Sequence, residues 1–255
     1  MKGSIELMKN VIWQYTKAPH GLICGETGSG KTFLIEALIL GFLKEGANIR
    51  ICDPKMSDLV FLGAVPSLSD KVFYTENKML QCMREFHEDM KVRQEEFMRL
   101  SFGTTGNTFA DFDMKPEVLV FDEYVAFVST LEMKEQRAFF GHMNQIILLG
   151  RQLGFFLIAG MQRPDAQFLP NGMRDQFGFR CAMGSMSPNA YIMMFGEANK
   201  AFRDYGKEQK GWGYANLGTG TIQTFFAPYV AKEFNFVTEI AKFFGEEVLT
   251  SLPGG

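Results

Sequence analysis

The chain has 255 residues, of which 46% are hydrophobic and 22% charged, so it is neither intrinsically disordered nor collagen-like. Lys and Arg total 26 and Asp and Glu total 29, which gives a formal net charge of −3. This balance excludes a protein coated in basic charge for nucleic acid, but not a localised basic site. The four cysteines are scattered singly, which predicts reduced, buried thiols of a cytosolic protein, and the three histidines are too dispersed to suggest a metal site.

Apolar runs of strand length alternate with longer helical patterns, which predicts an α/β domain with a mainly parallel sheet. In chain order, the pattern predicts strands at 11–15 and 21–25, a helix at 31–43, strands at 48–53 and 72–75, a helix at 76–100, a loop at 101–115, a strand at 118–122, a helix at 132–150, strands at 155–160 and 179–183, and a helix near 189–195. Glycine-broken, β-prone runs in 211–230 predict antiparallel additions, and 232–248 predicts a closing helix. We expect one domain over residues 1–255. Its apolar runs are shorter than the roughly 18 residues of a membrane span, so we expect no segment to cross a membrane. With the reduced cysteines, we expect the chain in the cytoplasm, or at the inner face of the membrane through other regions or partners.

A glycine-rich loop lies between the second predicted strand and the first predicted helix. It matches G-x-x-x-x-G-K-[ST] at every fixed position, through Gly25, Glu26, Thr27, Gly28, Ser29, Gly30, Lys31 and Thr32. The loop N–H groups and the helix N-terminus supply partial positive charge for a phosphate. Lys31 would reach the β- and γ-phosphates, and the Thr32 hydroxyl would ligate Mg²⁺. The loop therefore predicts a site for ATP and Mg²⁺, against the alternative of a chance glycine-rich turn.

Two adjacent carboxylates, Asp122 and Glu123, follow the apolar strand predicted at 118–122. Side chains of neighbouring strand residues point to opposite faces, so the two carboxylates can take different roles. We expect Asp122 to hold Mg²⁺ through water and Glu123 to act as the general base on the attacking water. The alternative is an acidic strand end that faces solvent.

A polar residue, Gln162, follows the strongly apolar strand predicted at 155–160. Ligands of parallel sheets bind at the carboxyl ends of the strands, so Gln162 could sense the γ-phosphate or orient water. The sequence leaves open the alternative of a glutamine that only makes hydrogen bonds within a turn.

These elements resemble the motor domain of the FtsK/SpoIIIE family of DNA translocases, within the HerA–FtsK group of ring ATPases. The resemblance covers about residues 11–230, and its blocks are Pro19-His20 before the phosphate loop, Asp53-Pro54-Lys55-Met56, Asp89-Met90 with Arg93, Gln162-Arg163-Pro164, the segment 174–180, and Gly211-Trp212-Gly213-Tyr214. Two departures from the family pattern are Gly160-Met161 before Gln162, and Gly178 in place of a proline. Since no membrane segment precedes the motor and no winged-helix domain follows it, we expect a shorter relative. The coupling ATPases of Gram-positive conjugative plasmids and integrative elements are of this kind.

The resemblance implies a RecA-like P-loop fold and a homo-oligomer, a hexameric ring that hydrolyses ATP and drives DNA through its pore. It also implies an arginine supplied in trans by the neighbouring subunit, with Arg151 as the first candidate, Arg180 the second and Arg163 the third. Each of these could instead form an ordinary surface salt bridge. Arg174 aligns with a basic position expected to contact DNA phosphates, and Lys55 could serve either the nucleotide site or the subunit contact. A membrane-embedded secretion or transfer apparatus could be a further partner through segments absent here.

Two other functions remain open on the sequence. One is a protein-secretion ring ATPase of the same superfamily, which would move polypeptide. The other is a nucleotide-binding module that regulates a partner with little turnover. The effect of DNA on ATP hydrolysis would separate these possibilities.

Overall fold

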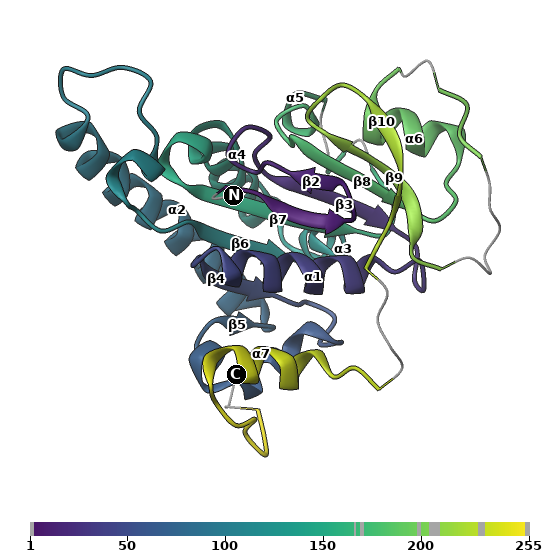
Figure 1. Ribbon diagram of the computed structural model, residues 1–255, viewed down its shortest axis with the longest axis horizontal. Helices are drawn as coiled ribbons and strands as arrows, with labels where there is room; N and C mark the ends of the chain where they lie inside the picture. The colour runs from purple at the N-terminus through teal and green to yellow at the C-terminus, as the bar shows by residue number, and fades with distance from the viewer. Residues whose placement is uncertain are drawn as a thin grey trace.

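The computed structural model describes residues 3–165, 167–168, 171–197, 200–203, 210–228 and 233–252. Within these residues, eight strands form one sheet in the order β10-β9-β8-β3-β7-β6-β4-β5 (Figure 1). The strands are β3 (Gly21–Gly25), β4 (Asn48–Cys52), β5 (Val72–Phe73), β6 (Glu117–Phe121), β7 (Phe155–Met161), β8 (Phe179–Met183), β9 (Trp212–Leu217) and β10 (Ile222–Phe226). The six strands from β8 to β5 are parallel, and β9 and β10 are antiparallel additions at one edge. The predicted fold class is confirmed.

Helices cover both faces of the sheet. The helices are α1 (Lys31–Lys44), α2 (Glu76–Leu100), α3 (Tyr124–Thr130), α4 (Met133–Leu153), α5 (Asn171–Arg174), α6 (Pro188–Phe195) and α7 (Phe236–Phe244). Alternate strand residues enter two separate cores, so that Ile23 packs with α1 on one face and Leu22 with α2 and α4 on the other. This alternation is why the strands are apolar throughout, as parallel strands buried on both faces must be.

The strand order fixes where polar residues gather. β3 lies between β7 and β8, and β6 lies between β7 and β4, all in parallel. The segments that follow β3, β4, β6 and β7 therefore leave the sheet at the same edge. These segments contain the phosphate loop, Lys55, the carboxylate pair and Gln162, which the sequence predicted on separate elements.

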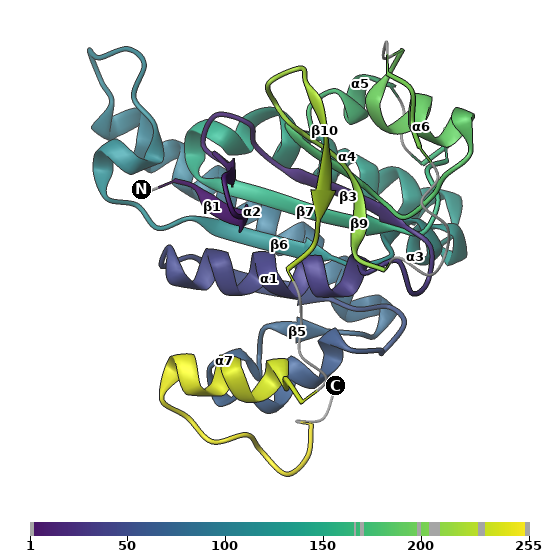
Figure 2. The ribbon, with the colours of Figure 1, turned by 45° about the vertical axis from the view of Figure 1, so that its right-hand side comes forward.

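Several predicted elements differ in extent. The strand predicted at 11–15 is β2 (Val11–Trp13), which begins as predicted but ends two residues earlier. It pairs with a strand that was not predicted, β1 (Ile5–Met8), in a separate two-stranded sheet against α1. The predicted loop at 101–115 contains the 3-10 helix η3 (Phe109–Phe112), and the 3-10 helices η1 (Leu59–Ala64) and η2 (Pro66–Leu68) follow β4. α7 is shorter than the predicted closing helix, whose first residue lies outside the described residues. α7 packs against η1 below the sheet (Figure 2).

The four cysteines are free and buried, as predicted. The histidines are less dispersed in space than in sequence, because the Nδ1 atoms of His87 and His142 lie 2.8 Å apart between α2 and α4. In the described part of the chain, no group of three His, Cys, Asp or Glu side chains could hold a metal ion. Of the helices described, none is long and apolar enough to cross a membrane.

Candidate nucleotide site

The phosphate loop connects the buried strand β3 to α1. Gly30 has a left-handed backbone (φ 99°), and a Cβ there would lie 2.9 Å from the Gly211 Cα, so both its conformation and its packing require glycine. The Gly211 N–H donates to the Ser29 carbonyl at 2.9 Å. Gly211, which directly precedes β9, therefore supports the phosphate loop from two strands away in the sheet.

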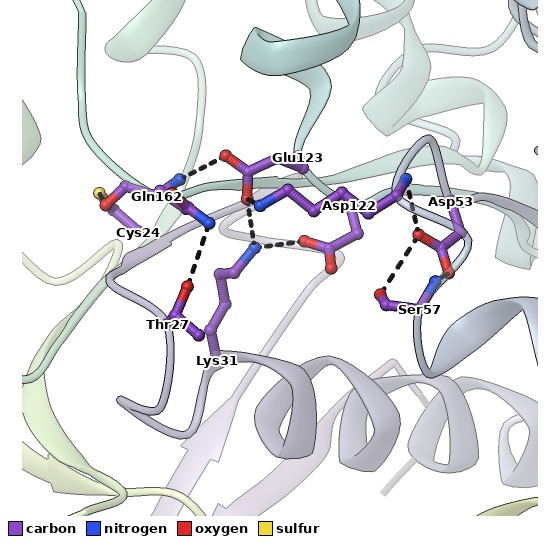
Figure 3. A network of polar contacts seen from close by, with 9 residues as sticks. Cys24, Thr27, Lys31, Asp53, Ser57, Asp122, Glu123 and Gln162 are labelled. Atoms are coloured by element: carbon purple, nitrogen blue, oxygen red, sulfur yellow. Dashed lines mark hydrogen bonds and ion pairs between the residues drawn. The ribbon is translucent and has the colours of Figure 1, made fainter.

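Three charged side chains form the centre of the site (Figure 3). The Lys31 Nζ lies 2.5 Å from the Asp122 Oδ1 and 2.9 Å from the Glu123 Oε2. The three residues are 8%, 5% and 4% exposed, respectively. Burial alone would lower the pKa of the Lys31 ammonium, but the two carboxylates outweigh it and hold that pKa above its usual value. The sequence placed the two carboxylates on opposite faces of a strand end, but β6 ends at Phe121 and both carboxylates contact the same ammonium.

Glu123 is held by its backbone and by three donors. Its left-handed conformation (φ 53°) turns the chain from β6 into α3, a geometry rarely adopted by residues other than glycine. The Gln162 N–H donates to the Glu123 Oε1 at 2.9 Å. The Lys55 Nζ lies 3.3 Å from the Glu123 Oε2, beside the Lys31 ammonium on the same oxygen. Both carboxylate oxygens of Glu123 are therefore occupied.

The turn that contains Lys55 is organised by Asp53, which directly follows β4. The Asp53 carboxylate accepts hydrogen bonds from the N–H groups of Lys55 at 3.2 Å, Ser57 at 2.9 Å and Val60 at 3.1 Å. Burial raises the pKa of the Asp53 carboxyl, and the negative charge of Asp122 adds to this, while these hydrogen bonds oppose it. The Asp53-Pro54-Lys55 block thus fixes the backbone from which Lys55 reaches the site.

Gln162 and Arg163 border the phosphate loop from the end of β7. The Gln162 Nε2 donates to the Thr27 hydroxyl at 3.2 Å, and Arg163 pairs with Glu26 at 2.9 Å with 80% of its side chain exposed. Gly160, one of the departures from the family pattern, lies so close to Asp122 that a Cβ would collide with the carboxylate. The substitution at that position therefore has a local packing reason.

A cavity of about 740 Å³ opens over the phosphate loop. Thr32, Asp122 and Gln162 line it, and so do residues that the sequence did not predict at the site: Phe33, Asp58, Lys210, Phe226, Ala227 and Pro228. Phe33 is 49% and Phe226 41% exposed, an unusual exposure for phenylalanine. Their signal in the sequence is weak, because Phe33 only follows the motif and Phe226 lies nearly 200 residues further along the chain.

Oxygen donors suited to Mg²⁺ are present in the same cavity. The Thr32 hydroxyl and the Asp122 carboxylate are hard ligands of the kind that Mg²⁺ takes, usually with phosphate oxygens and water completing its coordination. The residues therefore fit the predicted ion.

The remaining predicted arginines lie elsewhere. Arg151 and Arg180 line a second cavity of about 540 Å³ together with Lys17, at the amino ends of the strands. Arg180 lies 3.6 Å from Asp175 and its buried Nε has no hydrogen-bond partner among the described residues. The Arg174 guanidinium pairs with Asp175 at 2.9 Å and its side chain is only 12% exposed. The structure thus separates these arginines from the phosphate loop, whereas Arg163 lies beside it.

This fold and this site define a P-loop ATPase domain. The model of the FtsK/SpoIIIE family matches residues 3–188, and the chain belongs to that family. It is 44% identical over 238 residues to the FtsK domain-containing protein YdcQ of Bacillus subtilis, covering 93% of this chain and 49% of YdcQ. It is 24% identical over 206 residues to the DNA translocase SpoIIIE of the same organism, covering 74% of this chain and 26% of SpoIIIE. The chain thus spans about half the length of one relative and a quarter of the other.

Solved structures share the fold. The pCW3 conjugation coupling protein TcpA, in a monomer form with ATPγS, superposes with a TM-score of 0.73 at 19% identity, covering 96% of this chain and 71% of TcpA. The cytoplasmic domain of the type VII secretion ATPase EccC of Thermomonospora curvata superposes with a TM-score of 0.67 at 21% identity, covering 94% of this chain and 29% of that one.

Proposed function

We propose that this chain is a motor that hydrolyses ATP to move DNA, and that it works within a ring of identical subunits in conjugative DNA transfer. The observation that carries the proposal is the buried cluster of Lys31, Asp122 and Glu123 beside a cavity large enough for a nucleotide. Buried charges are costly unless they are paired or used, and charges gathered at the carboxyl ends of parallel strands favour a ligand site. Membership of the FtsK/SpoIIIE family supports DNA as the cargo.

The lining of the cavity suggests how ATP lies. The triphosphate would follow the loop N–H groups, and Lys31 would leave Asp122 for the β- and γ-phosphates. The base would stack on one of the exposed aromatic side chains of the lining, Phe33 or Phe226. Thr32 and Asp122 would hold Mg²⁺, which neutralises charge that develops on the phosphates.

Hydrolysis then needs a base and a group that orients water. Glu123 has a carboxylate next to the phosphate loop and can accept the proton of the attacking water. Gln162 donates through its backbone to Glu123 and through its side chain to Thr27, so it connects the base to the phosphate loop. This supports Gln162 as a γ-phosphate sensor rather than as a simple turn residue.

A ring would bring the second cavity of one subunit to the nucleotide of the next. Lys17, Arg151 and Arg180 concentrate positive charge there, at the opposite end of the sheet from the subunit's own phosphate loop. An arginine in trans would stabilise charge on the transferred phosphoryl group. Their location supports Arg151 and Arg180 ahead of Arg163, which pairs with Glu26 of its own subunit's phosphate loop.

We retain Arg174 as the DNA contact, provided that it can separate from the neighbouring Asp175. Because its guanidinium pairs with Asp175, a DNA phosphate would have to replace that carboxylate. Six such residues in a ring would give several phosphate contacts without a basic surface, and a grip that weakens with salt.

The proposal is tested by ATP hydrolysis with and without DNA. We expect DNA to stimulate turnover in the wild type, Lys31→Ala to weaken nucleotide binding, and Arg174→Ala to lower the stimulation while basal turnover persists. Stimulation by a protein substrate but not by DNA would favour the secretion ATPase. Binding of nucleotide without turnover at any protein concentration would favour a regulatory module. A mass measurement with DNA and a non-hydrolysable ATP analogue tests the hexamer.

A further inference from the structure

The Glu123 carboxylate is in a resting arrangement. Its Oε2 contacts two ammonium groups, Lys31 at 2.9 Å and Lys55 at 3.3 Å, and its Oε1 accepts the Gln162 N–H at 2.9 Å. A general base must offer a free lone pair to the water that it deprotonates. A carboxylate has about four lone-pair positions, and the two ammonium groups take both positions on Oε2. One of these ammonium groups therefore has to leave before Oε2 can accept a proton from water.

ATP itself would remove one contact. Lys31 lies between Asp122 and Glu123 at the base of the phosphate loop, and a triphosphate there would attract its ammonium. The Gln162 contact comes from the backbone and orients the carboxylate through the other oxygen. After Lys31 has left, the Lys55 ammonium still contacts the Glu123 Oε2.

Lys55 is anchored at its backbone and movable at its tip. β4 and β6 are paired with Cys52 opposite Phe121, so the turn after β4 lies beside Glu123. Asp53 fixes that turn through the Lys55 N–H and two further N–H groups. The Lys55 side chain is 40% exposed, against 6% for that of Glu123, so its ammonium can exchange Glu123 for solvent while the carboxylate stays buried.

From this geometry we propose that Lys55 is a positioning residue that restrains Glu123. Lys55 holds the carboxylate away from water after ATP has drawn Lys31 off, and hydrolysis waits until the Lys55 ammonium swings out. Lys55 thus limits the basal rate of ATP turnover, and any partner that separates its ammonium from the Glu123 carboxylate raises that rate. The inference rests on the proposed role of Glu123 as the base.

The experiment is steady-state ATP hydrolysis without DNA, for Lys55→Met, Lys55→Arg and the control Lys134→Met, an exposed lysine on α4. We expect Lys55→Met to raise kcat about two- to fivefold, the range that a part-exposed ion pair allows, with KM unchanged. Lys55→Arg keeps a cation at this position, so its kcat should be closer to that of the wild type. Thermal melting confirms that each variant is folded.

A second background separates the two hypotheses. When Glu123→Gln is already present, adding Lys55→Met should not raise kcat. Lys55→Met should also leave the Kd for a non-hydrolysable ATP analogue unchanged, both in the wild type and in Glu123→Gln. A fall in kcat, an unchanged kcat, or a weaker Kd in both backgrounds would overturn the inference, the last by making Lys55 a phosphate contact. Turnover of Glu123→Gln at the wild-type rate would instead overturn the proposed function.

Discussion

Strand β6 carries charged residues at both ends, and the two ends differ in how those charges are satisfied. At its start, Glu117 pairs with Arg93 at 3.0 Å, and the same guanidinium donates to the Lys115 carbonyl at 2.8 Å and the Leu153 carbonyl at 3.2 Å. At its other end, Asp122 and Glu123 share the ammonium of Lys31, and Asp122 and Lys31 line the nucleotide cavity.

The difference lies in what the charges can still bind. The Arg93 guanidinium also lies 4.6 Å from the centre of the Phe155 ring, so it ties α2 to the starts of β6 and β7 through protein partners that no ligand needs to replace. The carboxylates and Lys31 are paired with one another, and a triphosphate can replace one partner. Charges of the same type thus stabilise the fold at one end of the strand and form the site at the other.

The largest expected effect comes from the site end. Glu123→Gln should lower ATP turnover about 10²–10⁴-fold, the contribution of a general base, because the amide cannot accept the proton of water. The free energy of unfolding should change by less than about 1 kcal/mol, since Lys31 keeps Asp122 as its partner. Phosphate release and urea denaturation measure the two quantities, with the exposed Glu95→Gln as the control. Turnover within tenfold of the wild type would contradict the assignment.

The other end should respond in the opposite way. Arg93→Ala should lower the free energy of unfolding by about 2–3 kcal/mol, because it leaves Glu117 and two carbonyls without their charged donor. The affinity for a non-hydrolysable ATP analogue should stay the same. Arg84→Ala is the matched control on the same helix, since Arg84 makes only an exposed pair with Glu88 at 3.8 Å and should cost less than about 0.5 kcal/mol. Equal losses for the two variants would remove the structural role of Arg93.

A carboxyl near the site end should make stability depend on pH. Burial raises the pKa of Glu36 on α1 from 4.5 to about 7, and the nearby Asp58 adds to this. The folded pKa exceeds the unfolded one, so this stability is complete below about pH 4.5 and is lost as the pH rises through about 7. Glu36→Gln should therefore stabilise the chain by about 1–2 kcal/mol at pH 8, after solvent screening, and not at pH 4.5. Urea denaturation at both values tests this, and an equal effect at both would exclude it.

The smallest expected effect is a pH dependence of stability at the His87–His142 pair, with the opposite sign to that of Glu36. Burial lowers the pKa of both His87 and His142 below the usual 6.5, and among the groups around the pair Lys91 lowers both values further while Glu88 opposes this. Stability from this pair is present above about pH 6.5 and is lost as the pH falls. His142→Gln should reduce the loss of stability between pH 7.5 and 5.5 by less than about 1 kcal/mol, measured by thermal melting. An unaltered pH dependence would show that the pair does not titrate in this range.

The sequence predicts the sheet and the centre of the site well because their patterns are local. Where an apolar strand is followed by the loop 25–32, or by Asp122 and Glu123, the local sequence alone shows that the polar residues lie at the carboxyl end of the strand. The carboxyl ends of parallel strands meet at one edge of the sheet whatever the order of the strands, which the sequence does not predict. This is why Lys31 and the two carboxylates could be expected together although about 90 residues separate them.

What the sequence does not predict depends on contacts between distant segments. β1 is four residues long and becomes a strand only by pairing with β2, and α3 follows a left-handed Glu123 that no pattern indicates. Phe33 and Phe226 both line the cavity although they share no motif. The sequence left Lys55 either at the nucleotide site or at the subunit contact, and its distance to Glu123 favours the nucleotide site.

The most direct test of the account is a crystal structure of the chain with Mg²⁺ and a non-hydrolysable ATP analogue. We expect the triphosphate along residues 26–32, the Lys31 ammonium on its β- and γ-phosphates instead of on Asp122, and the ion between Thr32 and Asp122. A nucleotide bound elsewhere, or a Lys31 still paired with both carboxylates beneath a bound triphosphate, would contradict it.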